Sequence, residues 1–180
     1  MIETVRQRFA VRDVRAAIAR RTARPLPQRL AERSLLVVLP SDEPGQRAAW
    51  AWVGSLDLHD RQVHPVVVGE RVEYVPDRWA GAVRVIGAGE RDWRRLPNAA
   101  ARQSVWTLRP DVAVDLADPG DLGPALLVGA SPAAVRIGRW APGAEDAFDL
   151  MVQGEPDAAS AAGALGRLLG QIQPPILPLR

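Results

Sequence analysis

Three aspartates stand at a spacing that could bring their carboxylates together. Asp115 lies inside an apolar run at residues 112–116, and Asp118 and Asp121 follow it at intervals of three. If the run is a strand of a parallel sheet, these acids lie at its carboxyl end, where α/β sheets bind their ligands. They could hold magnesium or a sugar hydroxyl there. The structural alternative stays open, because Asp118 and Asp121 also suit the start of a following helix.

Other patterns typical of catalysis each lack an essential part. Residues 129–133 (GASPA) are close to the nucleophile turn of serine hydrolases, but Pro132 has no N–H to donate to an oxyanion. Residues 87–89 (GAG) follow a predicted strand, yet no third glycine completes a dinucleotide-binding loop. His59 and His64 have no regular shared face on which to hold a metal. We therefore predict no catalytic residue, metal site or cofactor, and we favour a protein that is not an enzyme.

The composition excludes several other kinds of chemistry. The chain has 180 residues, with no cysteine and no lysine; beside two histidines, its basic residues are 23 arginines. Without lysine there is no Schiff base and no phosphate-binding lysine of the Walker type, since arginine cannot replace either amine. Without cysteine there are no disulfides, thiolate nucleophiles or cysteine-ligated zinc sites. A chain of this length can still bury a core of its own.

The first 34 residues are strongly basic. They contain nine arginines against three acidic residues, whereas the rest of the chain is mildly acidic. A basic amphipathic helix can bind RNA phosphates or an anionic membrane surface, and the sequence does not distinguish the two. The alternative is a solvated helix that docks its apolar stripe, Val11, Val14 and Ile18, on its own domain. The arginines predicted to contact the anionic partner are Arg6, Arg8, Arg12, Arg15, Arg20, Arg21 and Arg24.

The order of apolar segments indicates the fold. Strands are expected at residues 35–39, 65–68, 82–86, 112–116, 134–137 and 148–152, and helices at 44–58, 98–107, 120–130 and 156–172. A further helix is predicted over residues 2–22, with a break or rotation near residue 10, because Ile2, Val5 and Phe9 form a second apolar stripe. The pattern predicts an α/β fold: a single Rossmann-like, mostly parallel sheet with helices on both faces, preceded by a basic N-terminal helix.

The chain divides into three predicted regions. These are a basic helical arm with a proline-containing linker at residues 1–34, the Rossmann-like domain at 35–172 and a proline-rich tail at 173–180. No transmembrane segment is expected, because the longest charge-free apolar run, residues 122–135, has only 14 residues and contains two prolines. Charges recur where a signal peptide needs an apolar core, so we expect the protein in the cytoplasm.

Trp50 is a candidate contact for another protein. Ala49, Trp52 and Val53 share one face of the helix predicted at 44–58, so Trp50 is expected to point sideways. Tryptophan is enriched at interfaces, and an exposed Trp50 could contact a partner protein or a second copy of this chain. The alternative is that Trp50 covers an edge of the core.

Four segments together carry a resemblance to known proteins. They are residues 112–116 (VAVDL), 122–130 (LGPALLVGA), 135–139 (VRIGR) and 148–152 (FDLMV). In this order they resemble a family of small uncharacterised α/β proteins from Bacteroidota, classed as a domain of unknown function. Those proteins also begin with a short basic helix and have a strand ending in Asp-Leu and a terminal FDLMI strand. The resemblance covers residues 5–172 and implies a bacterial protein of the same fold.

The central stretch is also similar to the acceptor-side half of heptosyltransferase-like glycosyltransferases, in which a DLVIDL strand precedes a helix and an RIG strand. That family has its catalytic acid in the loop after the first strand, where Asp42 is the nearest match here. The resemblance implies a ligand cleft formed by Asp42, Asp115 and Asp118. The family holds its nucleotide-sugar with a second α/β domain, for which 180 residues leave no room. The similarity therefore implies a shared fold more than a shared reaction.

Two functions follow as expectations. The favoured one is a non-catalytic cytoplasmic binding or adaptor domain whose basic N-terminal helix contacts RNA or an anionic membrane surface. The alternative is a glycosyltransferase-like domain that binds a sugar or nucleotide at Asp42, Asp115 and Asp118.

Overall fold

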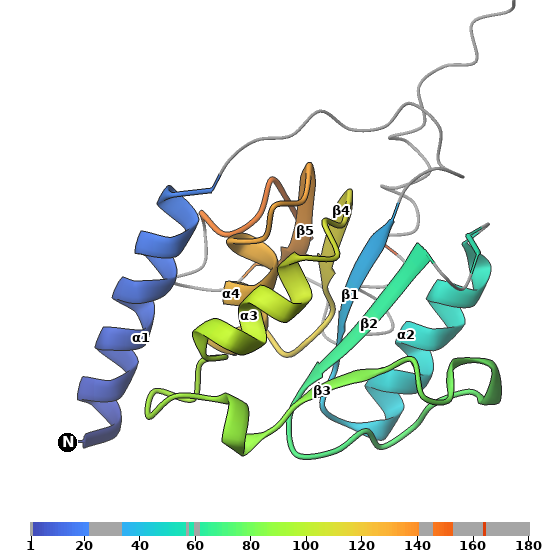
Figure 1. Cartoon of the computed structure of the whole chain (residues 1–180), viewed down its shortest axis with the longest axis horizontal. Helices are drawn as coiled ribbons and strands as arrows, with labels where there is room; N and C mark the ends of the chain where they lie inside the picture. Colours follow the sequence, from blue (N-terminus) through green and yellow to red (C-terminus); the bar gives the residue numbers. More distant parts are fainter. Residues whose placement is uncertain are drawn as a thin grey trace, which may run out of the picture.

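Six parallel strands form one sheet. The computed structural model describes residues 2–21, 34–56, 58–59, 62–140, 146–152 and 164. The strands in these residues are β1 (Leu35–Leu39), β2 (Val63–Val68), β3 (Arg84–Ile86), β4 (Val112–Asp115), β5 (Val135–Arg139) and β6 (Leu150–Val152). They pair in the order β3-β2-β1-β4-β5-β6, so the order reverses between β1 and β4 (Figure 1). The predicted α/β fold with a parallel sheet is confirmed.

Helices cover both faces of the sheet. The described helices are α1 (Ile2–Ala19), α2 (Glu43–Ser55), α3 (Ala99–Trp106) and α4 (Leu122–Gly129), with short 3-10 turns at η3 (Asp77–Trp79) and η4 (Ala88–Glu90). α2 lies on one face, whereas α3 and α4 lie on the other (Figure 1). α1 packs against α4, on the side away from α2. The predicted N-terminal helix is therefore present and rests on the domain that follows it.

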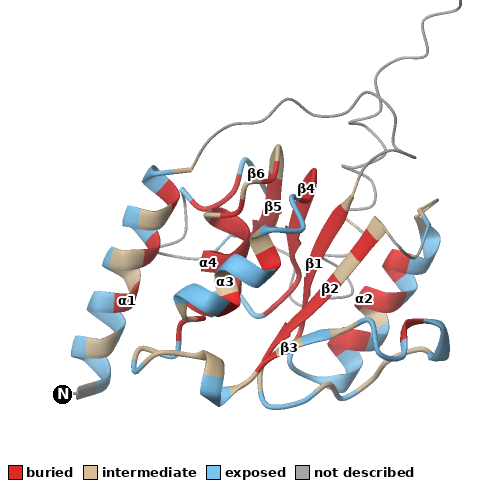
Figure 2. Cartoon of the chain, viewed as in Figure 1, coloured by how far each residue is buried: buried red, intermediate tan, exposed pale blue. Residues whose placement is uncertain are grey.

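The central strands β1 and β4 are buried on both faces, which explains their nearly continuous apolar sequences. In β1, Leu36 packs in the core under α3 and α4, whereas the neighbouring Val37 packs in the core under α2. This alternation is the geometry of a strand, whose successive side chains point to opposite faces. Apolar residues at every position are typical of a parallel sheet that is covered twice. Figure 2 shows this burial along β1, β2 and β4.

α1 is one unbroken helix, so the predicted break near residue 10 is wrong. Ala10, Val14 and Ile18 are buried against the domain, at the spacing of a single helical face. The second apolar stripe does not enter the core, because Val5 and Phe9 remain exposed. A break would be needed only if both stripes were packed.

α4 starts at Leu122, two residues later than the helix predicted at 120–130. Asp121 is the N-cap, and its Oδ1 accepts a hydrogen bond from the Gly123 N–H at 3.0 Å. Asp118 lies before the cap, in an exposed loop. Only one of the two aspartates that suited a helix start therefore caps the helix.

Some predicted segments lie outside the described residues. These are the linker after residue 21, the tail at 173–180 and most of the helix at 156–172, of which Ala164 is helical and packs on the core under α2. Of the helices that the structure describes, none combines the length and the apolarity that crossing a bilayer requires.

Candidate functional site

The first candidate site lies at the carboxyl end of β4. Asp115 is 7% exposed, and its Oδ1 accepts a hydrogen bond from the Ala117 N–H at 3.0 Å. The cavity beside it has a volume of about 10 Å³, and Asp118, Asp121 and Arg139 also line it. A cavity of this size has room for about one water molecule. The structure thus brings Asp115 and Asp118 together, but around a space too small for a sugar.

Burial changes the acidity of this cluster. It raises the pKa of Asp115 to about 7, with smaller increases from the charges of Asp121 and Asp118, and with opposing contributions from the Ala117 N–H and Arg139. Burial likewise raises the pKa of Asp121. An Asp115 that is partly protonated near neutral pH has the acidity that a proton-transferring group needs.

Asp42 does not line this cavity. It is the N-cap of α2, and its Oδ1 accepts a hydrogen bond from the Gly45 N–H at 2.8 Å. The loop around it is fixed by the buried Gln46, whose Nε2 donates to the Pro40 carbonyl at 3.0 Å and whose Oε1 accepts from the Tyr74 N–H at 2.7 Å. Many α/β proteins bind a phosphate at the loop after the first strand. In this chain the groups of that loop named above form hydrogen bonds within the protein.

Trp50 is a core residue rather than a surface for a partner. It is 4% exposed, and its ring stacks on that of Trp79 with 5.3 Å between centroids. Its Nε1 donates to the Tyr74 carbonyl at 3.1 Å. The sequence places Trp50 on the side of α2, and the segment around η3 folds over that side. This burial confirms the alternative that Trp50 covers an edge of the core, and it removes Trp50 as a candidate contact for a partner.

A larger hollow lies between α1 and α3. Its volume is about 470 Å³, and its walls come from α1 and the two residues after it, from α3, from the loop before α3 and from the end of α4. Four arginines and one carboxylate occur among its described lining residues. We call this hollow the basic groove and define it by Asp13, Arg20, Arg21, Arg94, Arg102 and Trp106.

Arg102 enters the groove from α3 with unused hydrogen-bonding capacity. Its Nε is buried and has no hydrogen-bond partner among the described residues. Its guanidinium lies 5.8 Å from the centre of the Trp106 ring, and the Trp106 Nε1 donates to the Leu127 carbonyl at 3.0 Å. A buried N–H without a partner is costly and therefore rare. The guanidinium of Arg102 can still donate to an anion.

Arg94 connects the opposite walls of the groove. It forms an ion pair with Asp13 of α1, and its Nη2 donates to Asp92 Oδ2 at 2.6 Å. The hydrogen bond to Asp92 raises the pKa of Arg94, which therefore remains charged. This bridge fixes the loop before α3 against α1.

The comparisons with known proteins find no match. No family model, no curated protein and no solved structure is similar to the chain. The resemblances to the Bacteroidota family and to the glycosyltransferases therefore stay predictions, and the function has to be inferred from the geometry of the sites.

Of the seven predicted arginines, Arg20 and Arg21 are among the described residues that line the groove. Arg20 is exposed and has no ion pair within the part of the chain that the structure describes. Arg21 also holds the end of α1 on the domain, since its Nη1 donates to the Ala147 carbonyl at 3.1 Å and its Nη2 pairs with Asp149 at 3.2 Å. Arg24 lies outside the described residues.

The other predicted arginines lie elsewhere on α1. Arg6 forms an ion pair with Glu3. Arg8, Arg12 and Arg15 are exposed and recur at the spacing of one helical face. The structure therefore does not gather all seven arginines on one surface, and α1 presents cations on more than one side.

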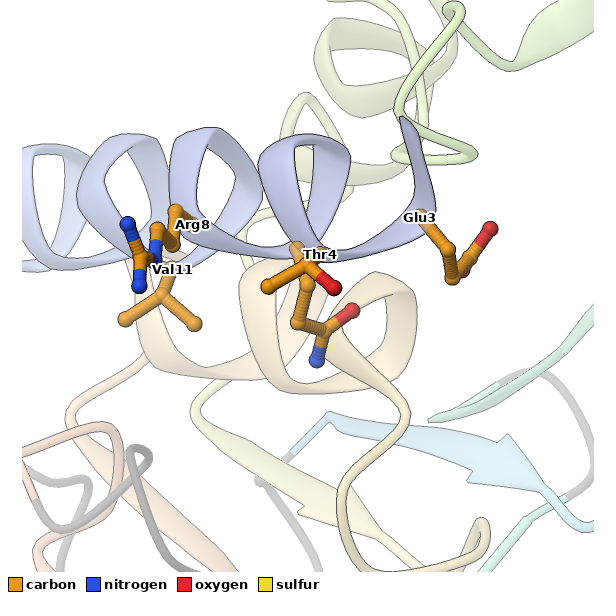
Figure 3. A pocket seen from close by; sticks show the side chains of 5 residues that line it. Glu3, Thr4, Arg8 and Val11 are labelled. Atoms are coloured by element: carbon orange, nitrogen blue, oxygen red, sulfur yellow. The ribbon is translucent and has the colours of Figure 1, made fainter. Parts of the chain in front are cut away.

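A second hollow follows the first half of α1. Its volume is about 520 Å³, and its described lining is Glu3, Thr4, Gln7, Arg8 and Val11. Figure 3 shows Thr4, Arg8 and Val11 projecting from one side of the helix. This hollow has one arginine and one glutamate, so its charge is balanced, unlike that of the basic groove.

Two arginines of the basic groove, Arg94 and Arg102, are absent from the sequence prediction. They lie more than seventy positions after Arg20 and Arg21 in the chain. The signal in the sequence is weak: a pair of adjacent arginines, Arg94 and Arg95, precedes a predicted helix that itself contains Arg102. Only the packing of α1 beside α3 brings these cations together.

Proposed function

We propose that this chain is a non-catalytic α/β binding domain whose basic groove binds the phosphates of RNA. The observation that carries the proposal is the convergence of four arginines from three segments on one hollow: Arg20, Arg21, Arg94 and Arg102. Guanidinium groups offer paired N–H donors that match phosphate oxygens. Several of them along a groove can follow a polyanionic backbone. Such a domain would serve as an adaptor in the cytoplasm.

RNA is favoured over a membrane surface because of how α1 is packed. A helix that lies on a membrane inserts its apolar face among the lipids. In this chain the main apolar face of α1, with Ala10, Val14 and Ile18, is buried against the domain, whereas Val5 and Phe9 of the second stripe remain exposed. The four arginines line a concave groove instead of a flat face, and a concave groove suits a strand better than a bilayer.

The lining of the groove supports binding rather than catalysis. Its one carboxylate among the described residues, that of Asp13, pairs with Arg94. The other lining side chains that the structure describes are cationic, aromatic or apolar. General acid–base chemistry needs a group that exchanges a proton near neutral pH, whereas arginine stays protonated.

Fluorescence anisotropy with a labelled single-stranded oligouridylate tests the proposal. We expect binding that weakens steeply with salt, because contacts to phosphates release counterions. Arg20→Glu and Arg102→Glu should each weaken the affinity by about tenfold and reduce the salt slope by about one. Arg71→Glu is the matched control, since it makes the same charge change at an exposed arginine away from the groove.

The proposal fails if wild-type protein does not bind the oligonucleotide at low salt, or if both groove variants bind as tightly as the Arg71→Glu control. Vesicles of phosphatidylserine and phosphatidylcholine serve as the second probe. Vesicle binding that depends on Arg102, without RNA binding, would show that the anionic partner is a membrane surface.

A sugar or nucleotide site at the carboxyl edge of the sheet is the second candidate function. The raised pKa of the buried Asp115 supports it, because perturbed carboxyl groups gather at functional sites. Binding would require the loop at 118–121 to open, since the cavity is small. A thermal shift with UDP-, ADP- or GDP-sugars that Asp115→Ala removes would support this function, and a flat response across the panel would contradict it.

A further inference from the structure

An exposed aromatic pair lies beside the basic groove. Trp93, in the loop before α3, is 63% exposed, and Phe9 on α1 is exposed as well. The two rings meet edge to face, with 6.0 Å between their centroids and 64° between their planes. Exposed aromatic side chains in contact across two elements are unusual on a soluble surface and mark interaction sites. We call Trp93 and Phe9 the aromatic platform.

The turn that carries Trp93 is held by its own hydrogen bonds. Asp92 Oδ1 accepts from the Arg94 N–H at 2.8 Å and from the Leu96 N–H at 3.2 Å. The Asp92 N–H donates to the Leu96 carbonyl at 2.8 Å, and Arg95 takes a left-handed conformation with φ of 65°. Burial alone would raise the pKa of Asp92, but these hydrogen bonds and those from the Arg94 side chain lower it. Trp93 is therefore presented on a closed turn.

Arg94 makes the platform and the groove one continuous surface. It lines the groove, and its Cζ lies 5.7 Å from the centre of the Trp93 ring. On the other side, the Cζ of Arg12 lies 5.0 Å from the centre of the Phe9 ring. The aromatic rings are thus flanked by cations, which favours an anionic partner over an apolar one.

Aromatic rings beside a groove of arginines form the surface that single-stranded nucleic acids need. Arginines contact the phosphates, while unpaired bases stack on exposed rings. Bases inside a duplex are already stacked and paired, so they cannot reach such a ring. Trp93 is 63% exposed even with Phe9 and Arg94 beside its ring, so part of the ring remains open for stacking.

We propose that Trp93 stacks on an unpaired base of an RNA strand whose phosphates lie in the basic groove, and that the protein therefore prefers single strands to duplexes. This inference rests on the proposed function, because the groove supplies the phosphate contacts. To that function it adds the class of RNA, single-stranded, and the residue that contacts a base, Trp93.

Anisotropy with three labelled probes tests the stacking: an oligouridylate, an abasic strand of equal length and a duplex. Trp93→Ala should weaken binding of the oligouridylate by about tenfold and leave binding of the abasic strand and the duplex nearly unchanged. Trp93→Phe should restore most of the affinity, since it restores a ring. Trp140→Ala, which removes another exposed tryptophan (41%), is the matched control and should bind like the wild type.

The outcomes separate this inference from the proposed function. If Arg102→Glu weakens binding of the oligouridylate but Trp93→Ala does not, the groove binds RNA and the stacking is refuted. An equal loss of affinity for the abasic strand in Trp93→Ala would also refute it, because the contact would then not involve a base. If wild-type protein binds no RNA at low salt, both proposals fail. Circular dichroism checks that Trp93→Ala is folded, which its exposure leads us to expect.

Discussion

Replacing Asp115 by asparagine should remove a pH dependence from the stability of the fold. Burial raises the pKa of Asp115 from 3.8 to about 7, so the folded chain binds this proton more tightly than the unfolded chain. A carboxyl with a raised pKa contributes stability that is fully present below its unfolded pKa and is lost as the pH rises through its folded pKa. Asparagine resembles the protonated acid and retains an oxygen that can accept from the Ala117 N–H.

The size of the effect follows from the two pKa values. The interval between 3.8 and about 7 corresponds to roughly 4 kcal/mol in the free energy of unfolding. Asp115→Asn should therefore match the wild type near about pH 4 and become more stable by up to roughly 4 kcal/mol above about pH 8. For a domain of this length, that gap corresponds to about 10 °C in Tm.

Urea titrations followed by circular dichroism measure the gap at several pH values. The difference between the two proteins isolates Asp115, because all other titrating groups are shared. Asp118→Asn is the control: its carboxylate is the smallest of the influences that raise the pKa of Asp115, so it should move the pH window down only slightly. A gap that stays constant from about pH 4 to 8 would refute the argument that burial sets this acidity.

Two further substitutions test the packing. Gly138→Ala should lower the free energy of unfolding by about 1–3 kcal/mol, because the added methyl would overlap the Phe148 ring. Gly89→Ala is the control and should be neutral, since a methyl added there meets no atom. Equal urea midpoints for the two variants would contradict this description of the packing. Arg21→Gln should destabilise the seating of α1 by about 1–2 kcal/mol through lost hydrogen bonds to carbonyls such as that of Ala147. Hydrogen exchange should then become faster in α1, whereas Arg8→Gln should leave it unchanged.

The fold was predictable because its signals are local. A strand covered on both faces must be apolar at nearly every position, as β1 is, and this pattern cannot be confused with an amphipathic surface strand. The two apolar stripes of α1 show where a local sequence pattern is not enough to predict packing. Two apolar stripes are visible in the sequence, but only packing decides that Val14 is buried and Phe9 is exposed.

The sites were harder to predict because they depend on contacts between distant segments. Spacing alone placed Asp115 and Asp118 together, since they lie at the carboxyl end of one strand. It could not show that Asp42 caps α2 instead of lining their cavity, or that Gln46 bonds the loop after β1 to the segment after β2. The helical periodicity of α2 likewise could not show which later segment would cover Trp50.

The basic groove combines two difficulties. One wall comes from the first helix, and the other comes from residues far along the chain, so no sequence window contains both. Arginine is also the only side chain here that is always cationic, and its abundance hides the few positions that matter. Arg102 has a buried Nε without a partner among the described residues, a property that appears only in three dimensions.

Arg21 holds the end of α1 on the domain, so the groove keeps its shape only while this helix is docked. Arg21 both anchors that helix and lines the groove, and Asp13 and Arg20 of the same segment form the wall opposite α3. Detaching about the first twenty residues would uncover the part of the core on which Ala10, Val14 and Ile18 pack, and it would remove half of the surface that we propose for RNA. Occupancy of the groove and attachment of the helix must therefore stabilise each other, so a bound strand would protect this segment from proteases.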